Sequence, residues 1–473
     1  MKANKFSIFN FLIPRERLFQ FSIIIALCAM MASCGVYKKY RSQSEAPQDL
    51  FGQVVTDSAS SVAELSWREF FTDPLLQDLI DSALVHNTNM RAARVAVGQA
   101  QASLKAAKLA YLPSLSLNPQ ASVSSMMNTK GSFSKASYGY SIPFQLDWNI
   151  GISGSATVNK RKAQAVLEQA KAQQQAMQAN VISAVAQAYC MLQLLDRQLE
   201  ILVMTDSLWD ESLETERALW ENGKAYSTAV HQMESSNLSV KMQIVDAIRS
   251  IRSIENSLCK LLAITPQPIR RNKWGAYIIP ERLGTGVPAT LLQNRPDIRL
   301  ADQQLAEAFY NTAAAKAAFY PSFSLTGLLG WTNNGGVVAD PGALLLQAAA
   351  SLAQPIFANG KLTAALKIAK LNQEDKLDQY VQTVIDAGNE VNEYLADCQV
   401  ARDKDRLYAR QVKVLKDAYD GTHALMDNGK ASYLEVLTAQ ESLLSAQLNE
   451  AENHYNGAMA LIGLYIALGG ATK

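Results

Sequence analysis

Alternating apolar and polar residues mark two stretches of the chain as β-strands. Between residues 114 and 124 the even positions carry Ser, Asn or Gln, and the odd positions carry mostly Leu, Ala or Val. After a polar, Gly-containing turn at about 128–134, large apolar residues occupy the even positions from 138 to 148. A period of two is typical of a strand that has one polar and one apolar side. The pattern predicts a β-hairpin over about 113–150.

A second hairpin is predicted over about 321–357. Large apolar residues alternate with Ser and Thr between Ser322 and Trp331, which predicts its first strand. The return strand, from about residue 342, is rich in Ala and Leu and has the least distinct pattern of the four predicted strands.

Two very long helices are predicted from stretches rich in Ala, Gln, Leu, Glu and Lys. Residues 155–222 contain neither Gly nor Pro, and as one helix they would extend roughly 100 Å. The stretch 359–428 has apolar residues spaced three, four or seven apart, as in a coiled-coil seam. An Asn-Gly pair at the end of each stretch predicts a left-handed turn followed by a returning helix. We therefore expect helical hairpins over 155–264 and 359–468.

The two halves of the chain repeat each other. The segment 106–117 recurs as 314–325, and the segment 218–225 recurs as 424–431, in the same order and at an offset of about 207 residues. Each half is expected to contain a helix, a β-hairpin and a long helical hairpin. The predicted organisation is an N-terminal segment 34–72, repeat 1 over 73–270, an equatorial linker 271–292 and repeat 2 over 293–473.

The predicted strands have the length and the two-sided pattern of transmembrane barrel strands. Strands of roughly 11 to 13 residues, apolar on one side and polar on the other, can cross a bilayer around a wet interior. A soluble sheet with its polar side toward bulk water is the alternative. Four strands cannot close a barrel, and each unpaired backbone group in lipid costs several kcal/mol. Several chains must therefore contribute strands to one wall.

The N-terminal region has the features of a signal peptide. Lys and Arg residues precede an apolar stretch over 19–31 that is too short to span a bilayer. The next residues, Met31-Ala32-Ser33-Cys34-Gly35, resemble the lipobox of bacterial lipoproteins, in which the Cys becomes the lipidated first residue. We expect a signal peptide over 1–33 and a lipid on Cys34, with an ordinary signal cleaved nearby as the alternative. In bacterial lipoproteins an Asp after the Cys indicates retention in the inner membrane. Here Gly35 follows, so the resemblance to lipoproteins implies the outer membrane.

Charge and candidate chemistry exclude several classes of function. The chain carries 44 Lys and Arg against 43 Asp and Glu, so no basic excess indicates a nucleic-acid partner. Because no His has metal-ligand spacing with another His or a Cys, we expect neither a metal site nor a cofactor. Cys190, Cys259 and Cys398 are expected to be buried small hydrophobic residues. The S-x-x-K string at 132–135 is assigned to chance, and no catalytic activity is expected.

Four strings, in order on the duplicated frame, resemble the TolC-type outer membrane factors of the OprM and NodT branch. They are Asn294-Arg295-Pro296-Asp297-Ile298, Tyr320-Pro321-Ser322 and the stretches 354–360 and 428–440. The resemblance covers nearly the whole mature chain. It implies a mostly α protein with a trimeric outer-membrane β-barrel of four strands per chain, continued across the periplasm by a long α-helical barrel.

The resemblance also implies a function and partners. Members of this family serve as the exit duct of a tripartite efflux pump, joined by a periplasmic adaptor to an inner-membrane transporter, commonly of the RND class. By analogy, the chain is expected to be a passive, lipid-anchored conduit for drugs, toxic small molecules or metal ions. An outer-membrane duct for type I protein secretion would share the same pattern. A periplasmic adaptor lipoprotein is a weaker alternative, because it would lack paired strands in both halves.

The family pattern points to two candidate sites on the helical hairpins. Two acidic positions that face the closed end of the duct correspond here to Glu435, which keeps the acid, and Thr438, which does not. A solvated helix face explains Glu435 equally well. The turns between the helices would dock the adaptor, although a Gly is also required there by the turn itself. These tip residues are Gly223, Lys224, Gly429 and Lys430.

Overall fold

The computed structural model describes residues 38–42, 65–125, 127, 131, 133, 136–151, 154–273, 295–333 and 343–470. The predicted signal peptide, Cys34 and most of the predicted linker 271–292 lie outside these residues, as do Ser132, Ser134 and Lys135. The chain divides into two compact units, each built from both halves of the sequence. We call them the strand unit (Met1–Ser42, Gln101–Val166 and Leu305–Asp375) and the helix unit (Gln43–Ala100, Leu167–Gln304 and Lys376–Lys473).

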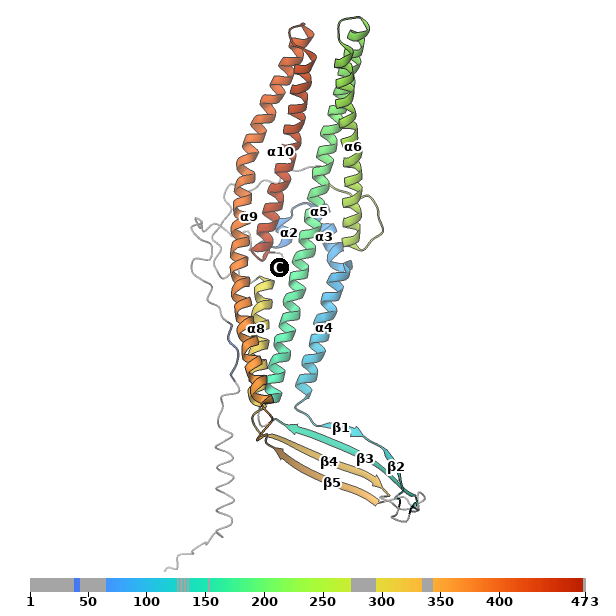
Figure 1. The fold of residues 1–473 in the computed structure, drawn as a ribbon, viewed down its shortest axis with the longest axis vertical. Coiled ribbons are helices and arrows are strands. Elements are labelled where there is room, and N and C mark those ends of the chain that lie inside the picture. Colours follow the sequence, from blue (N-terminus) through green and yellow to red (C-terminus); the bar gives the residue numbers. More distant parts are fainter. Residues whose placement is uncertain are drawn as a thin grey trace, which may run out of the picture. The chain divides into compact units, whose positions relative to one another are not determined.

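The strand unit contains one antiparallel sheet (Figure 1). Its strands follow the order β1-β3-β4-β5, and β2 pairs with β3 beyond the end of β1. The two hairpins are therefore joined side by side through β3 and β4, whose pairing runs from Ser141 opposite Thr332 to Ile150 opposite Phe323. The strands are β1 (Ser114–Leu117), β2 (Gln120–Ser124), β3 (Ser137–Ile150), β4 (Ser322–Thr332) and β5 (Ala343–Ala353).

The first predicted strand is divided in two. β1 and β2 keep one register against β3, with Leu117 opposite Phe144 and Gln120 opposite Ser141, so no residue is inserted between them. The break falls at Asn118 and Pro119. Because proline has no N–H to donate, the ladder is interrupted there, and the strand expected to be continuous becomes two short strands.

Helices join the sheet within the strand unit. The unit contains the C-terminal part of α4 (Thr88–Leu109) and of α8 (Pro296–Ala317), and the beginnings of α5 (Ser155–Glu221) and α9 (Lys361–Asp427). A small core of Val158, Ala165, Ala306, Tyr310 and Ala313 packs α5 against α8. Short side chains such as Ala allow the two helices to approach closely.

The helix unit contains most of both long helical hairpins, two short helices and the beginnings of α4 and α8. The two longest helices, α5 and α9, have 67 residues each and are returned by α6 (Ser227–Leu262) and α10 (Tyr433–Ala467). The long helices predicted by composition are thus confirmed. Gly388 and Gly421 lie inside α9 without ending it. The short helices are α2 (Trp67–Phe70) and α3 (Pro74–His86).

The main core of the helix unit lies where α2 and α3 pack against α5, α6 and α10. Phe71, Ile80, Ile182 and Tyr465 are fully buried there, and the ring of Phe70 stacks on that of Tyr465 at a centroid distance of 4.1 Å. Burying side chains of this size stabilises the fold by roughly 1.5–3 kcal/mol each. Within the described ranges, no helix combines the length and apolar character needed to cross a membrane.

Candidate functional site

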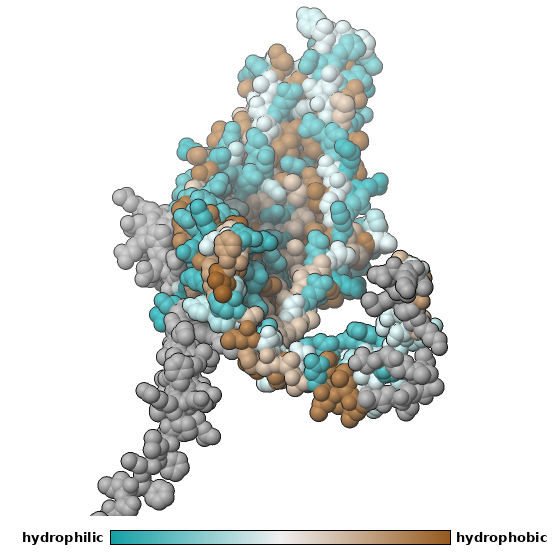
Figure 2. Space-filling model, turned by 60° about the horizontal axis from the view of Figure 1, so that its bottom comes forward, coloured by the Kyte–Doolittle hydropathy of each residue, from teal (hydrophilic) through white to brown (hydrophobic). Residues whose placement is uncertain are grey.

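One side of the sheet exposes large apolar side chains. In Figure 2 hydrophobic residues gather over part of the sheet, at the bottom of the view, beside hydrophilic ones. Exposed apolar surface of this extent marks a site of membrane or protein contact. The residues are 41–78% exposed: Leu115, Leu117, Val123, Tyr138, Ile142, Phe144, Leu329, Trp331, Leu344, Leu346 and Leu352.

The opposite side of the sheet is polar, as the alternation predicts. The Asp147 carboxylate lies at the centre of a hydrogen-bonded network there. The Thr326 hydroxyl donates to Oδ1 at 3.1 Å, and the Gln145 amide donates to Oδ2 at 2.8 Å. The Asn118 amide in turn donates to Gln145 Oε1 at 3.1 Å and to the Ser116 hydroxyl at 3.0 Å. The network links β1, β3 and β4 on the polar side.

Both helical hairpins turn through the same backbone motif. The N–H of Gly223 donates to the carbonyl three residues earlier at 2.9 Å, and that of Lys224 to the carbonyl five residues earlier at 2.8 Å. Gly429 and Lys430 form the same two bonds at the end of α9, at 2.8 Å each. With φ values of 69° and 68°, Gly223 and Gly429 adopt the left-handed conformation of a Schellman motif. The turns predicted from the Asn-Gly pairs are confirmed.

The four tip residues are all exposed. A rigid turn between two long helices presents its backbone and its Lys side chain to solvent at both tips. This geometry is compatible with docking to a partner, and it is equally required by the turn alone. The adaptor-docking role of Gly223, Lys224, Gly429 and Lys430 stays a prediction.

Glu435 and Thr438 lie one turn apart on the exposed side of α10. Glu435 Oε2 accepts a hydrogen bond from the backbone N–H of Ser432 at 2.7 Å, so the carboxylate caps the first turn of its own helix. The Thr438 hydroxyl donates to the carbonyl of Leu434 at 2.8 Å. The capping role alone explains why position 435 carries an acid, whether or not the side chain lines a pore. The pore-lining role of both residues stays a prediction.

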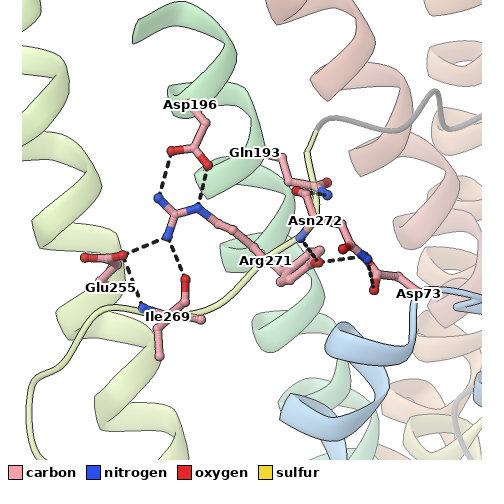
Figure 3. Close-up of polar contacts among 8 residues, drawn as sticks. Asp73, Gln193, Asp196, Glu255, Ile269, Arg271 and Asn272 are labelled. Carbon is pink, nitrogen blue, oxygen red and sulfur yellow. Dashed lines mark hydrogen bonds and ion pairs between the residues drawn. The ribbon is translucent and has the colours of Figure 1, made fainter. Parts of the chain in front are cut away.

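A buried arginine ties the loop after α6 to two helices (Figure 3). The Arg271 side chain is only 13% exposed, and its Nη2 and Nε contact both oxygens of Asp196 on α5. Its Nη1 donates to Glu255 on α6 at 2.7 Å and to the Ile269 carbonyl at 3.0 Å. Bidentate pairing of this kind fixes geometry as well as charge, so Arg271 acts as a clamp on the loop.

The adjacent residue continues this connection to the N-terminal helices (Figure 3). The backbone N–H of Asn272 donates to the Tyr189 hydroxyl at 3.0 Å, and that hydroxyl donates to Asp73 Oδ2 at 2.6 Å. Asp73 also caps α3 by accepting from the N–H of Leu75 at 2.9 Å. Burial raises the pKa of Tyr189, which keeps the hydroxyl protonated and able to donate. Sequence reasoning missed this network, and the Asp73-Pro74 helix start was its only local signal.

A cavity of about 720 Å³ lies beside the clamp, with walls from α5, α10 and residues 271–273. Its side chains carry charges of both signs, most of them already paired. Arg197 pairs with Glu200 at 2.7 Å, and His454 contacts Asp405 at 3.1 Å. The cavity therefore lacks the charge excess that would select a ligand of one sign.

Arg295, in the first string of the family resemblance, is also a structural anchor. Its side chain is 9% exposed and contacts Asp297 at 2.7 Å and Glu390 on α9 at 2.6 Å. Its Nη1 donates to the carbonyl of Ala467, at the end of α10, at 2.7 Å. The string thus joins the start of α8 to the second helical hairpin. Asn294 lies outside the described residues.

The structure buries all three cysteines that were predicted to be small hydrophobic residues, and the prediction is confirmed. Burial raises the pKa of Cys398 to about 11, which makes the thiol unreactive at neutral pH. In the part of the chain that the structure describes, no group of three or more His, Cys, Asp or Glu side chains is placed to hold a metal ion.

Comparison with known families assigns the chain. The model of the outer membrane efflux protein family matches residues 79–263 and 287–470. The chain belongs to this family. The two matched segments each contain one β-hairpin and one long helical hairpin, and together they span the sheet, both helix tips and the Arg295 anchor.

Individual relatives match along nearly their whole length. The chain is 28% identical over 459 residues to the cation efflux system protein CusC of Escherichia coli, covering 94% of this chain and 98% of the relative. It is 27% identical over 468 residues to the toluene efflux pump outer membrane protein TtgF of Pseudomonas putida, covering 94% and 96%. The solved structure of the outer-membrane channel OprN shares the fold with a TM-score of 0.84 at 22% identity, covering 93% of this chain and 100% of that chain.

Proposed function

We propose that three copies of this chain form the outer-membrane exit duct of a tripartite efflux pump. The observation that carries the proposal is the sheet, which has one exposed apolar side, one polar side and no strand paired beyond β1, β2 or β5 in the described residues. Family membership supports an efflux role, and the sheet supports a membrane-spanning wall with a wet interior.

The bare strand edges support assembly of several copies. β1 and β2 form one edge of the sheet and β5 forms the other. In lipid each unpaired N–H or C=O costs several kcal/mol, so both edges need partners. Pairing the β1 and β2 edge of one copy with the β5 edge of the next satisfies both. Three copies of a sheet that is four strands wide would close a barrel of twelve strands.

Exposed apolar stripes on the helix unit support the same assembly. α6 exposes Leu238, Met242, Val245 and Ile248, which recur every three or four residues and are 49–66% exposed. α9 exposes Val400, Leu407 and Val414, seven residues apart, which are 49–68% exposed. Heptad spacing is that of a helix-to-helix seam. Each stripe would be covered by a neighbouring copy in a continuous wall of helices.

Further partners follow from the role in a pump. The tips at Gly223 and Gly429 would meet a periplasmic adaptor, and the adaptor would join an inner-membrane transporter of the RND class. Because the described residues present no catalytic constellation, energy and most of the selectivity would come from the transporter. The relatives are named for different cargoes, cations for CusC and toluene for TtgF, so the family alone leaves the substrate open. Efflux names among the relatives favour this role over protein secretion.

The proposal is tested by purifying the full chain in detergent and inserting it into planar lipid bilayers. Native mass spectrometry is expected to show three chains in one particle, and the bilayers are expected to show stepwise ion conductance. A monomer that stays in solution without detergent and forms no conducting steps would contradict the duct.

A further inference from the structure

The polar side of the sheet carries a single full charge. Among all residues of β1 to β5, Asp147 is the only Asp, Glu, Lys or Arg. It lies in a row of paired positions that crosses the sheet from Ser114 through Asp147 and Thr326 to Ala349. The other members of the row are small and uncharged, so none of them supplies a counter-charge to the carboxylate.

The carboxylate is held in place without being neutralised. Its two oxygens accept from Thr326 and Gln145, which are both uncharged donors. Within the described ranges Asp147 forms no ion pair, in contrast to Asp196 and Asp297, which pair with Arg271 and Arg295. Neutral donors orient a carboxylate and leave its negative charge uncompensated.

We propose that Asp147 gives the strand-lined part of the channel a preference for cations. The inference rests on the proposed function, because the polar side of the sheet faces water only if copies close a barrel around it. Three copies would then place three carboxylates at one level of the lumen, held in place by Thr326 and Gln145. Rings of Asp or Glu favour cations and repel anions in pores.

A structural role must be separated from this one, because Asp147 also joins three strands by hydrogen bonds. The test uses the full-length protein in planar bilayers under a KCl gradient and measures the K⁺/Cl⁻ permeability ratio from the reversal potential. Asp147→Asn keeps the shape and removes the charge. At 0.1 M salt we expect the K⁺/Cl⁻ permeability ratio of Asp147→Asn to be about two- to fourfold lower than that of the wild type. The difference should be larger at 0.01 M salt, because the Debye length grows from about 10 Å to about 30 Å.

A charge-shift variant supplies the matched control. Asn149 is exposed on the same side of β3, two residues from Asp147. The double variant Asp147→Asn/Asn149→Asp removes the carboxylate from the network and returns the charge one row away, so the cation preference should be largely restored. A structural role alone would leave both variants equally altered.

The outcomes separate this inference from the proposed function. Wild-type protein that forms no channels contradicts the duct itself. Channels of Asp147→Asn with an unchanged permeability ratio overturn the role of Asp147 and leave the duct intact. If Asp147→Asn fails to insert into the bilayer, the single variant Asn149→Asp tests the inference instead. Its added charge is expected to raise the K⁺/Cl⁻ permeability ratio, and an unchanged ratio would overturn the inference.

Discussion

Two glycines of β4 differ sharply in the space around them. A Cβ placed on Gly330 would overlap the backbone of Ile142 and Pro143 on the paired strand, whereas a Cβ on Gly327 would lie 3.8 Å from the Leu146 side chain, an ordinary contact. Gly330 thus lets β3 and β4 approach at the point where Pro143 already removes one N–H from the ladder. This is a close backbone approach that only glycine permits.

Gly330→Ala is therefore expected to destabilise the pairing of the two hairpins by about 1–3 kcal/mol, as overpacking does. Gly327→Ala is the matched control on the same strand and should be close to neutral. Heat-induced unfolding of the detergent-solubilised protein, followed by circular dichroism, measures the difference. Equal melting temperatures for the two variants would refute the steric argument.

Glu216 is a buried acid that sequence reasoning did not single out. The residue lies on α5 and is only 4% exposed, and burial raises the pKa of its carboxyl group. A raised native pKa means that the charged form is disfavoured in the folded state. The cost is absent below the ordinary Glu pKa of about 4.3 and grows as the pH rises through the native value.

Glu216→Gln should accordingly raise the melting temperature at pH 7 and leave it nearly unchanged at pH 4. Glu221, an exposed acid on the same helix, provides the control, since Glu221→Gln should have little effect at either pH. Melting curves across this pH range test the prediction. A stabilisation of the same size at pH 4 and pH 7 would show that burial of charge is not the cause.

At the scale of elements, the loop after α6 is held by side chains rather than by regular structure. Residues 271 and 272 contact α5, α6 and the start of α3 through Arg271 and Asn272. Loops with few backbone bonds are usually the least stable parts of a fold. Here the mostly buried Arg271 side chain pairs with Glu255, which is also mostly buried, and with Asp196, which is partly exposed. These pairs replace backbone hydrogen bonds, so the loop depends on one arginine.

Arg271→Ala should cost roughly 3 kcal/mol, because it leaves Asp196 and Glu255 without their shared cation. Arg197→Ala removes an arginine from an exposed pair with Glu200 on the same helix as Asp196, and should cost at most about 1 kcal/mol. Urea unfolding compares the two, and limited proteolysis should cut Arg271→Ala in this loop first. Similar costs for both variants would mean that the clamp adds no stability.

Hydrophobic patterning predicts the elements well and their long-range pairing poorly. Period-two alternation locates the strands, and Asn-Gly pairs locate both helix tips, because these signals depend on neighbours in the sequence. The pairing of β3 with β4 joins residues such as Ser141 and Thr332, and no local pattern encodes it. The contact between Arg271 and Asp196 is likewise not encoded by any local pattern, because the packing of α5 against α6 brings the two residues together. The break at Pro119 could have been predicted from the sequence, because a proline interrupts a strand even where apolar and polar residues alternate.

At the scale of the whole molecule, the lipid anchor and the barrel would hold the protein in the membrane independently. Cys34→Ala is expected to abolish incorporation of labelled palmitate and to leave the proposed trimer largely intact, because the proposed assembly rests on strand pairing. Radiolabelling in growing cells measures the first effect, and native mass spectrometry of the purified variant measures the second. Label retained on Cys34→Ala would refute the lipobox.

The open edges of the sheet have a consequence for how the protein is made. A newly exported copy would cross the periplasm with exposed apolar strands and unpaired backbone N–H and C=O groups until two more copies bind. Such surfaces promote aggregation. For a duct built from three copies, completion of the native state would therefore depend on the concentration of the chain itself. Cells that make too little of the chain would accumulate incomplete assemblies. Cells that make it too fast would need chaperones to prevent aggregation of the unassembled copies.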